Sequence, residues 1–304
     1  MFKKVSVIFI LLFTASVLNA QSYLGKQHSF TLETEEMMKI FSGDGNLEKA
    51  SSYYFGLTFP QAIKAAKAKG VNPTVEEGKI YVDGKKFRFD TQDEDGKLSV
   101  IMNLETKIMY SIFWAKKEYM EVDIEKMKKM RDQMQKQMAT KMQGMGAYLD
   151  KLPPETRKKI EAMQSGNMPG AEEKADVNAT GKTKTINTFS CAEYIVSKKN
   201  KMEQIWASTQ YAELQRMFKE MELSMGDMQN SKSPVWEKIK GWPVHQVDVE
   251  INMMRGQGSV NYDEVYSIEK TTHKPGTFTP PAGFKRTKME DKMREGFGGF
   301  KQGN

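Results

Sequence analysis

Alternation of apolar and polar residues from Lys79 to Val122 is the feature that most constrains the fold of this chain. Pairs such as Asp83-Gly84 and Asp95-Gly96 separate the alternating runs. A period of two places apolar side chains on one side of a strand, and Asp-Gly pairs favour the tight turns of hairpins. The stretch therefore predicts a β-meander, a twisted antiparallel sheet whose apolar face has to be buried against another part of the chain.

Methionines at helical spacing interrupt the strand pattern twice. Six of them recur from residue 127 to residue 145 at steps of three and four, and four more follow from residue 217 to residue 228. This spacing places the thioethers on one stripe of a helix. We therefore predict a Met-rich helical insertion over residues 123–180, and a further Met-striped helix at Tyr211–Met228. Within the insertion, we predict a second helix at Glu155–Gln164 and a flexible linker at Ser165–Thr180.

The other segments complete a sheet of about ten strands. A short helix is predicted at Pro60–Lys69, because Pro60 suits a first turn and Gly70 suits an end. The segment His28–Phe41 mixes strand and helix character and stays undecided. Further strands are predicted at Lys182–Ile186, Cys191–Ser197, Met202–Ser208, Val244–Met253 and Gly258–Thr271, with a last short one after Phe284. The predicted class is α+β: one curved antiparallel sheet in a single domain over residues 21–288, with the helical insertion.

The two ends of the chain have their own signatures. Residues 1–20 combine Lys3 and Lys4, an apolar run and a small-residue site ending at Ala20, which is typical of a signal peptide. We therefore expect a periplasmic or secreted protein that starts at Gln21. Residues 289–304, with their Gly-Phe repetition, predict a disordered tail. Cys191 is the only cysteine, so no intramolecular disulfide can form, and we interpret it as a small buried hydrophobe.

Composition argues against several function classes. The formal net charge is +7, but the basic residues are spread among acids, so nucleic acid is not expected as a partner. Peripheral contact with anionic lipid headgroups stays open. No Gly-x-Ser-x-Gly or comparable catalytic pattern occurs, so we predict a protein that is not an enzyme and needs no cofactor. His28, His245 and His273 lack ligand spacing, which disfavours zinc, whereas Cu(I) held by the Met stripe is a minor alternative.

Short motifs in both strand blocks are similar to an exported bacterial family. They are Lys86–Asp90, Met102–Tyr110, Gly181–Ile186, Phe189–Val196 and Ile205-Trp206. The family is catalogued as domain of unknown function 4412, and its members resemble the lipoprotein-carrier (LolA/LolB-like) proteins. That resemblance implies an incomplete antiparallel barrel over helices, which encloses an apolar cavity. It also places Arg88 where carrier-like proteins often have an Arg. The chain departs from the family at Asn187-Thr188, where Asn-Gly is common.

These observations lead to a predicted function. We expect a binding module for an apolar, lipid-like ligand in the cell envelope, with the Met-rich helix acting as a mobile cover. The same aromatic residues could instead form a filled core. The alternative function is a protein-interaction or structural envelope module that presents its Met-rich helices to a partner. We expect a monomer, and a monomer whose two Met-rich helices face each other would need no such partner. The predicted ligand-binding residues are Phe87, Arg88, Phe89, Ile112, Trp114, Met130, Met134, Met138, Tyr194 and Trp206.

Overall fold

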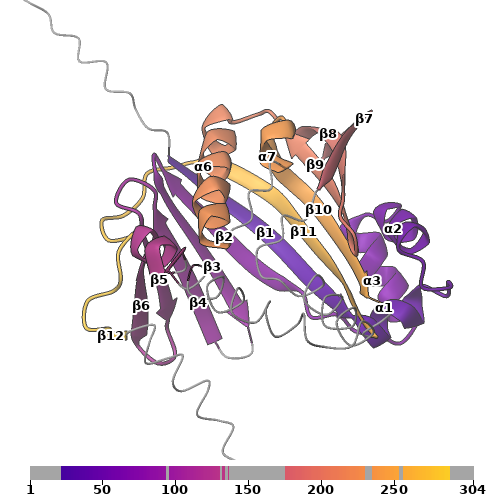
Figure 1. Ribbon diagram of the computed structural model, residues 1–304, viewed down its shortest axis with the longest axis horizontal. Coiled ribbons are helices and arrows are strands. Elements are labelled where there is room, and N and C mark those ends of the chain that lie inside the picture. Colours follow the sequence, from indigo (N-terminus) through magenta and orange to yellow (C-terminus); the bar gives the residue numbers. More distant parts are fainter. Residues whose placement is uncertain are drawn as a thin grey trace, which may run out of the picture.

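A twelve-stranded sheet dominates the part of the chain that the structure describes (Figure 1). The computed structural model describes residues 22–93, 96–130, 132–133, 136, 175–229, 235–252 and 256–287. The predicted signal peptide and the predicted disordered tail lie outside the described residues. The strands are β1 (Ser22–Glu33), β2 (Glu76–Asp83), β3 (Lys86–Asp93), β4 (Gly96–Asn103), β5 (Ile108–Phe113), β6 (Glu118–Asp123), β7 (Asp176–Ile186), β8 (Phe189–Ser197), β9 (Lys201–Ser208), β10 (Trp242–Asn252), β11 (Gln257–Lys270) and β12 (Lys285–Thr287).

The sheet is open and mixed, with the order β12-β6-β5-β4-β3-β2-β1-β11-β10-β9-β8-β7. Neighbours pair antiparallel, except that β12 runs parallel to β6. The predicted α+β fold with an incomplete antiparallel barrel is therefore wrong, as is the estimate of about ten strands. Period-two patterning identifies strands and their faces, but it does not reveal closure. Here β1 pairs with both β2 and β11, which joins two meanders side by side into one extended sheet.

The meander predicted from Lys79 to Val122 is confirmed as β2 to β6. Its first turn contains Gly84 at a φ of 59°, a left-handed conformation that glycine adopts without strain. The strands predicted at the C-terminal side are confirmed as β8 to β11. Strand β7 is longer than expected, because residues 176–180, which we assigned to a flexible linker, already belong to the strand that pairs with β8.

Helices are the smaller part of the described structure. They are α1 (Thr34–Ile40), α2 (Leu47–Phe55), α3 (Phe59–Ala68), α6 (Ala212–Gln229) and α7 (Val235–Lys238). The predictions of α3 and α6 are confirmed, and α3 begins with a reciprocal cap in which Thr58 and Gln61 bond each other's backbone. The helical insertion is minor in what the structure describes: a helix starts at Ile124, where Asp123 accepts a hydrogen bond from the Lys126 amide. The predicted helix Glu155–Gln164 lies outside the described residues.

The long central strands change the face that they bury halfway along their length. In β1, Tyr23 lies on the face that α6 covers, called the α6 face below, whereas Phe30 and Leu32 lie on the opposite face. Strand β10 behaves alike, with Val244 packing toward α6 and Val249 toward α1–α3. One sheet therefore carries two cores on its two sides.

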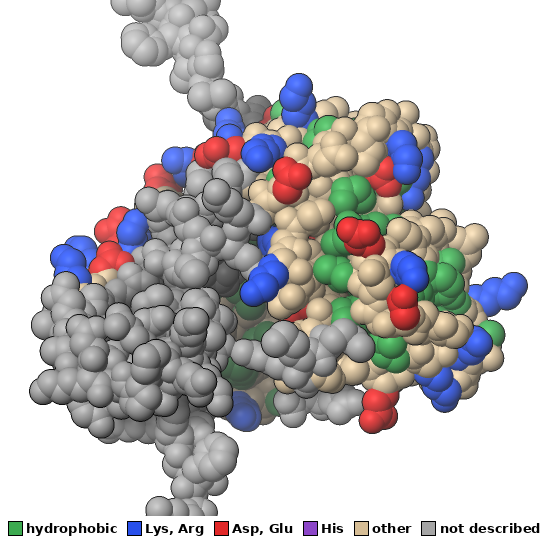
Figure 2. All heavy atoms as spheres, turned by 45° about the vertical axis from the view of Figure 1, so that its right-hand side comes forward, with side chains coloured by type: hydrophobic (Ala, Val, Ile, Leu, Met, Phe, Trp, Pro, Cys, Tyr) green, Lys and Arg blue, Asp and Glu red, His purple; other side chains and the backbone are tan. Residues whose placement is uncertain are grey.

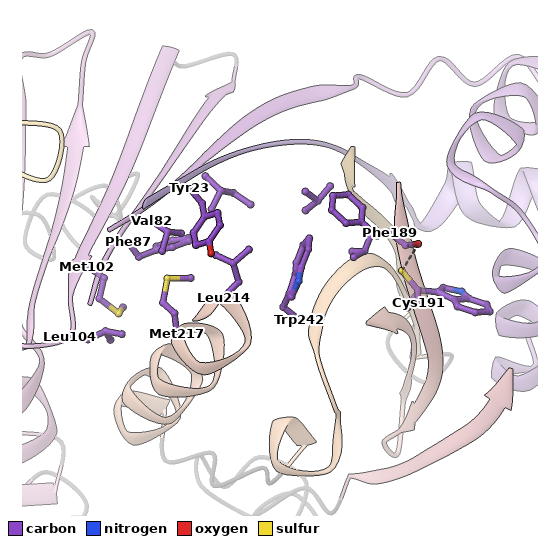
Figure 3. Packing of buried hydrophobic residues seen from close by; sticks show 14 of the residues in the cluster. Tyr23, Val82, Phe87, Met102, Leu104, Phe189, Cys191, Leu214, Met217 and Trp242 are labelled. Carbon is purple, nitrogen blue, oxygen red and sulfur yellow. Dashed lines mark hydrogen bonds between the residues drawn. The ribbon is translucent and has the colours of Figure 1, made fainter. Parts of the chain in front are cut away.

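Helix α6 lies against one face of the sheet (Figure 1), on the side toward which the strands curve (Figure 3). Leu214 and Met217 on this helix are buried against Tyr23, Val82 and Phe87 of the sheet. Fully burying an aliphatic side chain of this size contributes about 1.5–3 kcal/mol. Packing, supported by a side-chain contact between Tyr23 and Glu213, therefore holds α6 on the sheet.

Candidate binding pocket under helix α6

A pocket of about 170 Å³ lies where the central strands change from one core to the other. By the strand registers, its side chains come from β1, β2, β10 and β11, and from α6 above them. Its lining consists of Gln27, Ile80, Phe218, Pro243, Val244, His245, Gln246, Asp263, Glu264 and Val265.

One wall of the pocket is apolar. Ile80, Val244 and Val265 belong to the core under α6, and Phe218 of that helix packs against this core. The ring of Phe218 lies edge-on to Phe87, at 6.3 Å between centroids. Strand alternation places all three aliphatic residues on the α6 face. The helix and the sheet thus enclose an apolar recess.

The other wall is polar and includes one carboxylate. Gln246 and Asp263 are direct cross-strand partners, and Gln27 pairs with Val265 two residues further along β11. The registers place these three polar side chains on the same face as the aliphatic wall. Gln246 donates to Asp248 at 2.9 Å, whereas Asp263 has no hydrogen-bond or ion-pair partner among the described residues.

Burial raises the pKa of Asp263 to about 6. The carboxylates of Asp248 and Glu76 add to the shift, and Lys201 opposes it. Lys201 is already engaged, since its Nζ lies 3.0 Å from Oε1 of Glu203 and 3.0 Å from Oδ2 of Asp248. Lys201, the cation that acts on Asp263, is therefore shared with two other carboxylates.

A row of three side chains, His28, Glu264 and His245, lies on the opposite face, directly behind the pocket. Nδ1 of His245 is 3.1 Å from Oε2 of Glu264, and Nε2 of His28 is 3.5 Å from Oε1. Burial alone would raise the pKa of Glu264, but the two imidazoles and a hydrogen bond from Asn187 hold it well below its usual range. The ring of His28 stacks on Phe59 of α3 at 3.7 Å. This row fixes β1, β10 and β11 beneath the pocket.

The two histidines of this row were considered in the sequence only as separate metal ligands. Their wide separation in the chain hides that both flank Glu264 across neighbouring strands. Within the described residues, no group of three or more His, Cys, Asp or Glu side chains could hold a metal ion. We therefore interpret the row as a structural contact between β1, β10 and β11.

Of the predicted ligand-binding residues, Phe87 and Phe89 lie nearest this pocket. Both are on the α6 face, and Phe89 pairs with the pocket residue Ile80. The Phe89 ring lies over Gly78, which stands opposite Gln27 in β1. A Cβ at Gly78 would lie 2.7 Å from the ring, so glycine is needed for this approach.

Arg88, Ile112 and Trp114 lie on the opposite face of the sheet, away from Phe87 and Phe89. Arg88 makes two bonds to Asp90, at 2.6 and 2.9 Å, and donates to the carbonyl of Thr277 at 2.8 Å. Its guanidinium lies 5.3 Å from the Tyr81 ring centroid and 5.8 Å from that of Trp114. Ile112 is fully buried. This part of the predicted site holds the segment between β11 and β12 on the sheet.

The remaining predicted residues are spread over other parts of the molecule. Tyr194 is buried against Val235 and Ile239, near α7. The ring of Trp206 lies beneath the ammonium group of Lys184, at 4.0 Å. Met130 is 42% exposed. Met134 and Met138 lie outside the described residues, so their predicted role as a cover stays a prediction.

Surface charge is mixed on the side of the molecule shown in Figure 2. Lys and Arg side chains alternate with Asp and Glu over its described residues, with apolar patches between them. In the described part of the chain, no helix is both long enough and apolar enough to cross a membrane.

The fold and the pocket define an open, twisted β-sheet protein with one helix laid over a small pocket that is part apolar and part acidic. Residues 156–284 match the family described as "Domain of unknown function (DUF4412)". The predicted resemblance to domain of unknown function 4412 is thus confirmed for this part of the chain, which includes β7 to β11 and α6. The motifs Lys86–Asp90 and Met102–Tyr110 lie outside the match, and the resemblance to lipoprotein-carrier proteins stays a prediction. No curated protein matches the chain.

Solved structures show only distant likeness. The crystal structure of an uncharacterized conserved protein from Thermus thermophilus is 6% identical, with a TM-score of 0.39, and the match covers 88% of this chain and 91% of that one. Two structures of PNGF-II, in the C2 and P21 space groups, are 8% and 10% identical, with TM-scores of 0.37 and 0.36. These matches cover 91% and 90% of this chain, which spans 32% of PNGF-II in both cases.

Proposed function

We propose that the protein is a non-catalytic binding module that takes an apolar group into the pocket between α6 and the sheet. The observation that carries this proposal is the apolar wall, built by Ile80, Val244, Val265 and Phe218 from four separate elements. Ligand sites are typically concave and mostly apolar, with a few polar groups that fix orientation. The pocket has this composition, with three polar side chains along one edge.

The volume of the pocket limits the group that it takes. An apolar cavity of about 150 Å³ binds benzene, and the pocket measures about 170 Å³. The proposed ligand therefore inserts about six carbon atoms, such as the end of an acyl chain or one aromatic ring. The signature of residues 1–20 supports a place for this activity outside the cytoplasm, in the periplasm or the medium.

Hexan-1-ol tests the proposal, because it supplies a neutral six-carbon chain. Titration into protein labelled at Ile and Val methyl groups should shift the signals of Ile80, Val244 and Val265 in a saturable manner. Phe218→Ala should weaken binding about tenfold or more, since it removes one wall. The matched control is Met221→Ala, which also truncates a half-buried residue of α6 that packs on the core but does not line the pocket.

Two outcomes would refute the proposal. One is the absence of saturable methyl shifts with hexan-1-ol. The other is equal weakening by Phe218→Ala and Met221→Ala, which would indicate loosening of α6 instead of loss of a pocket wall. Circular dichroism of both variants checks that the helix is retained.

A second candidate function is protein interaction through the Met-rich helix that starts at Ile124. It is favoured by the exposure of Met130, a large thioether that adapts to several surfaces. Met130→Lys should then abolish co-purification of an envelope protein while leaving the hexan-1-ol shifts unchanged. Identical co-purified proteins for the variant and the wild type would exclude this use of Met130.

A further inference from the structure

The polar edge of the pocket consists of Gln27, Gln246 and Asp263, and it determines which head group a ligand can carry. This inference rests on the proposed function, because it concerns the same pocket. Asp263 is the acidic residue whose side chain points to the α6 face within the lining, since Glu264 alternates to the opposite face and contacts His28 and His245. A carboxylate without a partner beside an apolar recess is costly unless a ligand or water satisfies it.

The surroundings of Asp263 carry an excess of negative charge. The charged groups that act on it are Asp248 of β10, Glu76 of β2 and Lys201 of β9. Further along the same face, Nζ of Lys198 lies 2.8 Å from Oε1 of Glu203, which also contacts Lys201. The two ammonium groups thus stand against four carboxylates, including Asp263 itself. A negatively charged ligand head would be repelled here, and a cation would be attracted.

We propose that the pocket selects apolar ligands that carry a protonated amine, with the chain between Phe218 and the aliphatic wall and the ammonium group at Asp263. Gln27 and Gln246 lie on the same edge, and their amide oxygens are suited to accept the remaining N–H bonds. An ammonium group offers three donors, which matches an edge of one carboxylate and two amides. The ligand class is therefore an alkyl or aryl amine.

Three six-carbon compounds with different head groups test this assignment: hexylamine, hexan-1-ol and hexanoate. At about pH 8, hexylamine should bind at least about tenfold more tightly than hexan-1-ol, because a charged hydrogen bond replaces a neutral one, and hexanoate should bind most weakly. Asp263→Asn should remove the preference for the amine, so that the ratio of the two affinities falls to about one. Asp44→Asn is the control for net charge, since Asp44 lies on an exposed loop and pairs with Lys49.

The pH dependence gives a second readout. Hexylamine stays protonated across the range, so its affinity should rise from about pH 5 to pH 8 as Asp263 ionises, whereas Asp263→Asn should give a flat profile. A persistent amine preference in Asp263→Asn, or equal affinity of the amine and the alcohol in the wild type, would overturn the assignment while the pocket itself stands. Absence of hexan-1-ol binding would instead refute the proposed function.

Discussion

The phenol of Tyr23 on β1 donates a hydrogen bond to Oε2 of Glu213 on α6, at 3.1 Å. Tyr23→Phe removes this bond, and we expect it to lower the free energy of unfolding by about 1 kcal/mol. Urea unfolding measures this cost, and hydrogen exchange should show faster opening of α6. Tyr266→Phe is the matched control, because it also removes a tyrosine–glutamate bond, here to the exposed Glu77. Equal loss of protection in α6 for both variants would contradict the assignment.

The same pair predicts how alkali acts on the helix. Burial and the hydrogen bond to Glu213 raise the pKa of Tyr23 from 10.0 to about 12. A group whose pKa is raised on folding contributes its stability below the unfolded value and loses it as the pH rises through the folded value. The contribution of Tyr23 should therefore be complete below about pH 10 and disappear toward about pH 12. In Tyr23→Phe this part of the alkaline destabilisation should be absent.

Arg88 anchors the segment between β11 and β12 to the sheet. Arg88→Met keeps most of the aliphatic volume but leaves the buried Asp90 with Lys97 as its remaining cation, at 3.1 Å. Breaking a buried pair costs about 3–5 kcal/mol, and we expect about 3 kcal/mol here because Lys97 compensates in part. Backbone amides between Thr271 and Phe284 should also exchange hydrogen faster, since the bond from Arg88 to the Thr277 carbonyl is lost. Arg286→Ala, which breaks the exposed pair with Glu121, should cost less than about 1 kcal/mol.

A side chain at Gly78 should destabilise the protein. In Gly78→Ala the new Cβ would meet the Phe89 ring at 2.7 Å and Cγ of Gln27 at 2.9 Å, so one of them must move. Overpacking of this kind costs about 1–3 kcal/mol, which thermal unfolding can measure. Combining it with Phe89→Leu should recover part of the loss. The control is Gly56→Ala, at a helical φ of −74° with its nearest contact at 3.3 Å, which should be neutral or slightly stabilising.

Acid should unfold the protein partly through Glu264. Its pKa lies well below the usual 4.5, because the two histidines and Asn187 outweigh the effect of burial. A carboxyl with a lowered pKa contributes stability above its unfolded pKa and loses it as the pH falls toward the folded value. Stability should therefore decrease steadily below about pH 4.5. Glu264→Gln should flatten this part of the curve, and an unchanged slope would show that other carboxyls cause the loss.

The pattern of apolar and polar residues was sufficient to predict the secondary structure of segments that keep one period and bury one face. Strands β2 to β6 are local hairpins with steady alternation, so both their existence and the turns that the structure describes between them were predictable. The undecided segment His28–Phe41 spans the end of β1 and all of α1. Because β1 buries Tyr23 on one face and Phe30 on the other, its apolar residues follow neither a strand period nor a helix period throughout.

For helix α2 and for the pocket, the sequence signals were weak or absent. Helix α2 was missed although Asn46 caps it, accepting a bond from the Lys49 amide at 3.1 Å, because the sequence before it suggested only a loop. The pocket was not predictable, since Phe218 and Asp263 belong to elements that only the tertiary fold brings together. Arg88 and Phe87 are adjacent in the chain, and strand alternation itself places them on opposite faces, which the predicted site did not respect.

The change of buried face within the central strands has a consequence for folding fidelity. A slip of one residue between β1 and its neighbours would expose Tyr23 on one side and Phe30 on the other in the same step, because every side chain changes sides. Both halves of β1 therefore require the same register for burial of their apolar side chains. A misaligned chain would lose both cores together, so wrong pairings of β1 should be short-lived and rarely trapped during refolding.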